Sequence, residues 1–184
     1  MSTGQSVKLA DIYKFLAQAI RYPEADWFND EFLAVYHTLL EGLEWPEGAQ
    51  VPTKVDEQSL EDVQVEYTRL FINAVPHVVA PPYGSVFIDG SLNGVTADQT
   101  RKYYREHGFD ITSNEFPDHI VTELDFVALL EEGEEGSSEE FLAQLFRPWF
   151  DQFRAKVLEE SQDAYISTTI KLIDFFTREE EEGD

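Results

Sequence analysis

Apolar residues recur at helical spacing through most of the chain. In residues 7–21 they fall three and four positions apart, which places them on one face of a helix that Pro23 ends. The same spacing returns over 25–43 and, more strongly, over 57–74. No two segments show the alternation of apolar and polar residues that neighbouring strands would need. The pattern therefore predicts an all-α protein.

Prolines and glycines divide the middle of the chain. Residues 75–86, Val-Pro-His-Val-Val-Ala-Pro-Pro-Tyr-Gly-Ser-Val, cannot form a long helix or a central strand, yet they are unusually hydrophobic for a surface loop. Next, Thr-Ala-Asp-Gln at 96–99 resembles a capping box that opens a helix ending at Gly108. A further helix is expected to begin at Pro117, because proline suits the first helical position, and to end near Glu131.

Charges, glycines and serines interrupt the pattern at 131–138, Glu-Glu-Gly-Glu-Glu-Gly-Ser-Ser, which predicts a flexible hinge. Residues 137–140 resemble a second capping box, for a helix that continues to about Glu160. A last helix is expected over 162–178, followed by a disordered acidic tail at 179–184.

The expected architecture is a compact bundle of about six or seven helices with a Pro-rich insert and a hinge before the last two. Its parts are an N-terminal helical region, the hinge, the C-terminal helices and the tail, at 1–130, 131–138, 139–178 and 179–184. Such a hinge would allow two chains to exchange their last helices, so a monomer and a domain-swapped dimer are both open.

Composition narrows the class of protein. A chain of 184 residues with 42% hydrophobic residues is long and apolar enough to fold around one sizeable core. The 37 acidic residues against 13 basic ones argue against nucleic acid or an anionic membrane surface as partner and favour a basic partner. A purely solubilising role, or a salt-rich cytoplasm, explains the same charge equally well.

Several kinds of chemistry and location are disfavoured by what the sequence lacks. It has no cysteine, hence no disulfide, thiolate nucleophile or Cys-ligated metal. It also lacks a Gly-rich phosphate loop, an H-E-x-x-H motif and a G-x-S-x-G elbow around Ser85. No apolar run is long enough for a secretory leader or for membrane insertion, so a cytoplasmic protein is expected.

The segment that starts at Pro117, Pro-Asp-His-Ile-Val-Thr-Glu-Leu-Asp-Phe, carries most of the candidate chemistry. Treated as a helix, it has an apolar arc for the core, with acidic, imidazole and aromatic side chains outside that arc. These side chains are Asp118, His119, Glu123, Asp125 and Phe126. A helix of this kind is expected to face a partner or a second domain.

A second interpretation of this segment is catalytic. His119 and Glu123 have the i,i+4 spacing of helical metal ligands, with Asp118 beside them, which leaves a small metal-dependent hydrolase open. No third convergent ligand, nucleophile or substrate loop accompanies them, and a histidine oriented by a carboxylate explains the same spacing. We therefore expect no catalytic residue and no bound metal. Elsewhere, Glu66 and Arg69 are expected to form a structural ion pair.

Three motifs occur in order: Glu-Tyr-Thr-Arg-Leu-Phe at 66–71, Pro-Pro-Tyr-Gly-Ser-Val-Phe at 81–87, and the segment at 117–126. Together they resemble the TorD/DmsD/NarJ family of cytoplasmic redox-enzyme maturation chaperones. Tyr103 with Gly108, and Trp149 with Phe153, extend the resemblance over roughly residues 10–178.

The resemblance implies an all-helical fold, no catalysis and a defined kind of partner. Family members bind the signal peptide, and often the body, of a molybdenum-cofactor enzyme's catalytic subunit, and hold it back from twin-arginine export until the cofactor is inserted. The positions that would contact the peptide are Tyr83, its neighbour Ser85, Asp118, His119, Glu123, Asp125 and Phe126. The acidic hinge would repel an anionic nucleotide, so no nucleotide or other cofactor of its own is expected.

The chemistry of these residues agrees with such a ligand. Carboxylates are the natural partners of guanidinium, so Asp118 and Asp125 are expected to face the basic end of a leader. Tyr83, Val86 and Phe126 would contact its apolar stretch, as when a helix is laid in a groove. Which oxidoreductase is served stays open. A structural adaptor that binds only the mature subunit is also open.

Overall fold

The computed structural model describes residues 6–178 except 75 and 113, so the tail expected at 179–184 lies outside the described residues. The α-helices are α1 Leu9–Ala19, α2 Asp30–Gly42, α3 Glu57–Tyr67, α4 Gly84–Ile88, α5 Val95–Glu106, α6 Ile120–Gly133, α7 Glu139–Phe141, α8 Arg147–Glu160 and α9 Ala164–Thr177. A short 3-10 helix spans Gly48–Gln50, and short π-helical segments span Thr68–Ile72 and Leu142–Phe146. This part of the chain contains no β-strand, which confirms the all-α prediction. None of its helices is long and apolar enough to cross a membrane.

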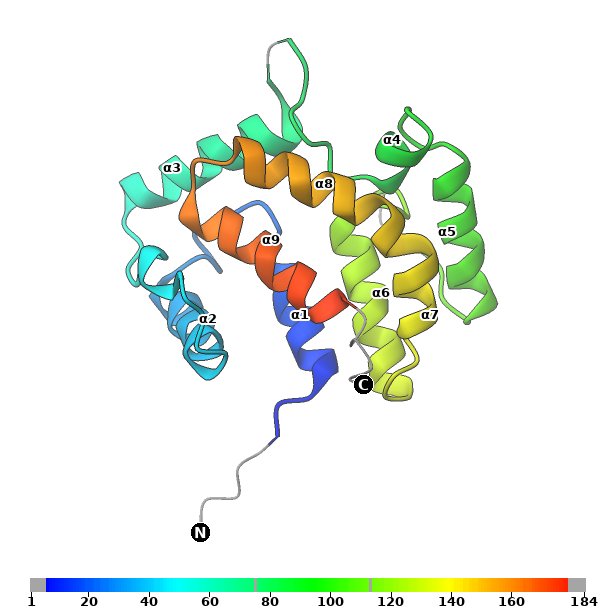
Figure 1. The fold of residues 1–184 in the computed structure, drawn as a ribbon, viewed down its shortest axis with the longest axis horizontal. Helices are drawn as coiled ribbons and strands as arrows, with labels where there is room; N and C mark the ends of the chain where they lie inside the picture. The colour runs from blue at the N-terminus through cyan, green and yellow to red at the C-terminus, as the bar shows by residue number, and fades with distance from the viewer. Residues whose placement is uncertain (1–5, 75, 113, 179–184) are drawn as a thin grey trace, which may run out of the picture.

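Helices α1 and α6 pack along each other at the centre of the molecule (Figure 1). Helix α8 crosses above them, and α9 turns back against α8 and α1. Helices α4 and α5 lie at one end, with α2 and α3 at the other. The aromatic face of α8 fills the space between these layers, because Trp149, Phe150 and Phe153 are fully buried.

Buried tyrosines connect the layers through their hydroxyl groups. The last carbonyls of α1 have no partner within the helix. Two of these carbonyls are bound from other helices: Tyr165 donates to the Ala19 carbonyl at 2.7 Å, and Tyr67 donates to the Ile20 carbonyl at 2.8 Å. The end of α1 is therefore held in place by α9 and α3.

The predicted structural ion pair between Glu66 and Arg69 is confirmed. Arg69 binds both carboxylate oxygens, at 2.9 and 2.8 Å. Arg69 also donates to the Glu160 carbonyl at 2.7 Å, and Glu66 accepts the Gln162 N–H at 2.8 Å. The pair thus fixes the end of α3 to the turn between α8 and α9.

Helix α5 begins without the capping box predicted at 96–99. Its N-cap is Gly94, which has no side chain to accept a bond. Asp89, from the preceding turn, instead accepts the Thr96 N–H at 2.8 Å and the Thr96 hydroxyl at 3.1 Å. The cap comes from outside the four-residue window that defines the motif. The other end is as predicted, with Gly108 just beyond the helix at a φ of +84°.

The capping box predicted at 137–140 is also wrong, because Ser138 bonds backwards to α6. Its N–H donates at 3.2 Å and its hydroxyl also donates to the buried carboxylate of Glu131. Glu131 accepts the Gly136 N–H at 2.9 Å as well, and the Ser137 hydroxyl donates to the Leu130 carbonyl at 2.6 Å. The segment 131–138 is thus hydrogen-bonded to the end of α6. Its role as a hinge, the division of the chain there and the exchange of helices remain predictions.

Candidate functional site

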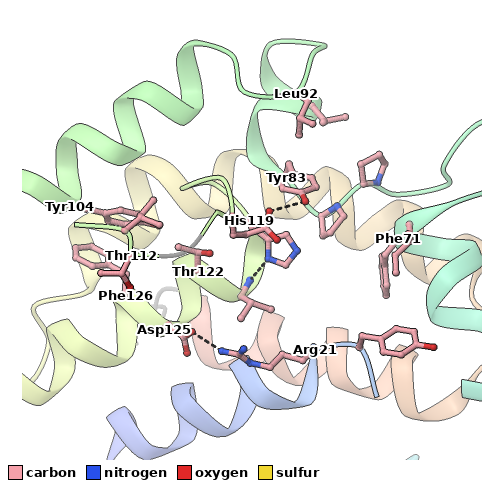
Figure 2. A pocket seen from close by; sticks show the side chains of 18 of the residues that line it. Arg21, Phe71, Tyr83, Leu92, Tyr104, Thr112, His119, Thr122, Asp125 and Phe126 are labelled. Atoms are coloured by element: carbon pink, nitrogen blue, oxygen red, sulfur yellow. Dashed lines mark hydrogen bonds and ion pairs between the residues drawn. The ribbon is translucent and has the colours of Figure 1, made fainter. Parts of the chain in front are cut away.

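A groove of about 950 Å³ opens beside the start of α6. Its walls come from the turn after α1, the end of α3, the Pro-rich segment, the loop after α5 and one side of α6 (Figure 2). Most of the lining is aromatic or aliphatic. The charged lining residues are Arg21, Asp110, Glu115 and Asp125.

The Pro-rich segment forms one wall because it pairs with the residues before α6. The Gly84 N–H donates to the Asp118 carbonyl and the Ile120 N–H donates to the Pro82 carbonyl, both at 3.0 Å. Tyr83 and His119 face each other as an isolated antiparallel bridge between these bonds. The segment packs against the body of the protein, where Ala80 is fully buried, and this explains why it is hydrophobic although it forms no regular helix or strand.

This pairing changes the expected start of the helix. Residues 117–119 do not begin α6, which starts at Ile120 with His119 as its N-cap. His119 is extended, with φ −68° and ψ 138°, and its Nδ1 accepts the Val121 N–H at 3.2 Å. The Pro117 carbonyl accepts the Tyr104 hydroxyl at 2.6 Å. Asp118 therefore lies before the helix, and the prediction that it belongs to a helical face is wrong.

Asp118 is fully buried and supports the groove wall from behind. One oxygen, Oδ2, accepts the Ser85 N–H at 2.6 Å, and Oδ1 has no hydrogen-bond partner among the described residues. Ser85 is also fully buried, at the start of α4. The neighbouring Gly84 allows the close packing, because a Cβ there would lie 2.9 Å from Trp149 Cδ1. Direct peptide contact by Asp118 or Ser85 does not fit this burial.

Glu123 faces the core, so its expected position outside the buried arc of the helix is wrong. It is fully buried, and its Oε2 accepts the Trp149 Nε1–H at 3.0 Å. Burial raises the pKa of Glu123 well above its usual value; the Trp149 hydrogen bond opposes that shift and the Asp118 charge adds to it. Helix α1 packs along α6, and α8 brings Trp149 to the side of α6 that carries Glu123, so this side is covered.

Tyr83 and His119 contact the groove directly (Figure 2). The Tyr83 hydroxyl donates to Glu115 at 2.9 Å, and its ring meets the His119 ring edge-on with centroids 4.9 Å apart. Burial lowers the pKa of His119, and the charge of Arg21 acts in the same direction, while Glu115 and Asp118 oppose the shift. A neutral ring whose Nδ1 accepts a hydrogen bond carries its proton on Nε2.

Asp125 and Phe126 line the other side. Asp125 forms an ion pair with Arg21, with Nη2 2.9 Å from Oδ2 and both side chains nearly half exposed. Phe126 was expected outside the core, but it is buried, with its ring centroid 4.4 Å from that of Tyr104 and 5.0 Å from that of Phe141. Helices α5 and α7 cover that side of α6, so Phe126 belongs to an aromatic cluster beneath the groove.

Some lining residues have no counterpart in the sequence prediction. Arg21 lies 104 positions from Asp125, and no spacing rule connects the two. Glu115, Phe109 and Ile111 lie in the loop before α6 and were assigned no role. The hydrophobicity of 109 and 111, just after a helix-ending glycine, was the available signal.

Comparison with known proteins identifies the family. The family model described as nitrate reductase delta subunit matches residues 26–155. The chain belongs to this family. Together with the next two matches, this confirms the TorD/DmsD/NarJ resemblance seen in the motifs.

Two relatives illustrate the family likeness. The chaperone protein TorD of Actinobacillus succinogenes is 34% identical over 100 residues, which are 52% of this chain and 50% of that protein. The match therefore spans about half the length of this curated relative. A solved structure of a proposed redox enzyme maturation protein from Archaeoglobus fulgidus has a TM-score of 0.70 and 30% identity, over 96% of this chain and 99% of that one.

Replacement of Asp118 by alanine is expected to lower the free energy of unfolding by about 1–3 kcal/mol, because the buried Ser85 N–H loses its acceptor. Asparagine keeps an acceptor oxygen and should lose less. Urea unfolding followed by circular dichroism measures both variants. Equal losses for the two, or none for alanine, would contradict this role for Asp118.

Proposed function

We propose that this protein is a chaperone, not an enzyme, and that its groove holds a basic and apolar segment of a redox-enzyme precursor. The observation that carries the proposal is the composition of the groove, which combines an apolar lining with three carboxylates and one arginine. Membership of the nitrate reductase delta subunit family and the names of the two relatives point in the same direction.

The finer proposal is that the segment is the twin-arginine leader of a molybdenum-cofactor oxidoreductase, held in the cytoplasm before export while its cofactor is inserted. Such a leader carries two guanidinium groups followed by an apolar, helix-forming stretch. Asp125 and Glu115 lie at the groove and replace Asp118 as the carboxylates that would meet arginine. Tyr83 and Val86 offer apolar contact beside them.

The small metal-dependent hydrolase has less support. His119 faces the groove, whereas Asp118 and Glu123 are fully buried, so the three side chains do not meet at one open site. Within the described ranges, no group of three or more His, Cys, Asp or Glu side chains is placed to hold a metal ion. The other alternative is a structural adaptor that binds only the mature subunit. Identification of the bound client, described below, distinguishes this adaptor from a protein that binds the leader.

Binding of a synthetic peptide tests the groove. The peptide has two consecutive arginines followed by a Leu/Ala stretch, and its control has glutamines in place of both arginines. We expect Asp125→Asn to weaken binding of the arginine peptide about two- to tenfold and to leave the control peptide unchanged, because the lost contact is a partly exposed ion pair. Fluorescence anisotropy measures the dissociation constants.

Glu132→Gln is the matched control, because Glu132 is an exposed carboxylate on the same helix that pairs with Lys14 away from the groove. An equal weakening by both variants would mean that overall charge, not the groove, drives binding. Failure of the natural protein to bind the arginine peptide would reject leader recognition.

The client is identified by purifying the tagged protein from anaerobically grown host cells and analysing bound proteins by mass spectrometry. Recovery of a molybdoenzyme subunit with its leader attached supports the full proposal. Recovery of only the leaderless subunit supports the adaptor and rejects leader binding in the groove.

A further inference from the structure

The groove contains its own guanidinium. Arg21 follows the C-cap of α1, and its side chain extends to α6, where Nη2 lies 2.9 Å from Asp125 Oδ2 (Figure 2). Among the described lining residues Arg21 is the only arginine or lysine, while the acidic ones are Asp110, Glu115 and Asp125. Arg21 is thus paired with Asp125, the carboxylate that we expect to bind an arginine of the ligand.

We propose that Arg21 is an internal competitor for the client's arginine: it binds Asp125 in the empty groove and gives up that carboxylate when a client guanidinium enters. This inference rests on the proposed function, because it concerns the same groove and the same class of peptide. Arg21 would then lower the affinity of the groove for weakly basic segments, which cannot displace it from Asp125.

The geometry suits an exchange. The two side chains are 45% and 46% exposed, and ion pairs in contact with water are weak and easily replaced. The contact joins Nη2 to Oδ2 only, rather than using both guanidinium edges as a bidentate pair would. A better-aligned guanidinium can therefore displace it.

Arg21 is also favourably placed once displaced. It lies at the C-terminal end of α1, where the helix carbonyls favour a positive charge. Release from Asp125 therefore leaves it in a favourable electrostatic position, and entry of the ligand need not disturb α1.

The alternative explanation is that the pair only joins α1 to α6. Lys14 and Glu132 form a second exposed ion pair along the same two helices, away from the groove. Lys14→Gln and Arg21→Gln each remove one positive charge and one α1–α6 ion pair. Only Arg21→Gln also frees a groove carboxylate, so comparison of the two variants separates the explanations.

The test measures the dissociation constants of the arginine peptide and of its glutamine control for the natural protein, Arg21→Gln and Lys14→Gln. We expect Arg21→Gln to bind the arginine peptide about two- to fivefold more tightly, the range that loss of an exposed ion pair allows. We expect unchanged binding of the control peptide, and less than about a twofold change for Lys14→Gln. In an Asp125→Asn background, Arg21→Gln should no longer tighten binding.

Each other outcome rejects the inference in a distinguishable way. If the natural protein binds the arginine peptide but Arg21→Gln binds it equally or less tightly, Arg21 is not a competitor and the proposed function stands. The same holds if Lys14→Gln tightens binding as much, since a general charge effect would then explain the gain. If no form binds the arginine peptide, the proposed function and this inference fail together.

Discussion

Replacement of Trp149 by alanine is expected to lower the free energy of unfolding by about 3–5 kcal/mol, near the upper end of core truncations. Trp149 is fully buried on α8 and is the largest of the fully buried side chains. Its ring lies against Phe146 and Phe153, with centroids 5.6 and 5.5 Å away, and against the backbone of Gly84. Its indole N–H is also the donor that Glu123 accepts. Truncation removes apolar contacts, opens a cavity and leaves a buried carboxyl group without its donor.

Trp45→Ala is the matched control for this prediction. Trp45 is only partly buried and packs edge-on against Phe175, whose side chain is 52% exposed. Its loss should therefore cost less than the loss of Trp149. Urea unfolding followed by far-ultraviolet circular dichroism compares the variants without relying on tryptophan fluorescence. Similar losses for the two tryptophans would contradict the central position given to Trp149.

The helices were predictable where one apolar stripe decides both their existence and their burial. The stripes over 7–21 and 57–74 correspond to α1 and to α3 with its following turn. Helix starts were less predictable, because distant residues fix them. Asp89 caps α5 from the preceding turn, and pairing with the Pro-rich segment keeps 117–119 extended. Neither interaction is contained in a four-residue motif.

For the candidate site, too, some residues were predictable from the sequence and others were not. Sequence motifs led to Tyr83, His119, Asp125 and Phe126, and the structure places all four along one groove. The helical wheel failed for Glu123, because it ranks positions by hydrophobicity and does not show how many neighbours will cover a helix. Arg21 could not be found at all, since only the packing of α1 on α6 brings it to Asp125.

Three unpartnered polar atoms lie behind the groove wall. Asp118 Oδ1, Glu123 Oε1 and Ser85 Oγ are buried and have no hydrogen-bond partner among the described residues. Burial without a cation raises the pKa of the Glu123 carboxyl group, because desolvation penalises its charged form. The charge of Asp118 adds to this shift, so the ionisation of Glu123 makes the wall sensitive to pH.

Glu123 should therefore make the protein less stable as pH rises. Burial raises the pKa of Glu123 well above the usual value, while in the unfolded chain its pKa is about 4.3. Between these two pKa values the folded state holds more protons than the unfolded state. The free energy of unfolding then falls with increasing pH, by up to about 1.4 kcal/mol per pH unit for one group.

Glu123→Gln should remove this loss. The glutamine oxygen can still accept the Trp149 N–H, and the amide has no proton to release. We expect the stability of the variant relative to the natural protein to increase steadily from pH 5 to pH 8, as measured by urea unfolding at each pH. The exposed Glu132→Gln on the same helix should show a nearly constant difference over that range. A constant difference for Glu123→Gln as well would mean that Glu123 ionises alike in the folded and unfolded chain, and that the wall behind the groove is indifferent to pH.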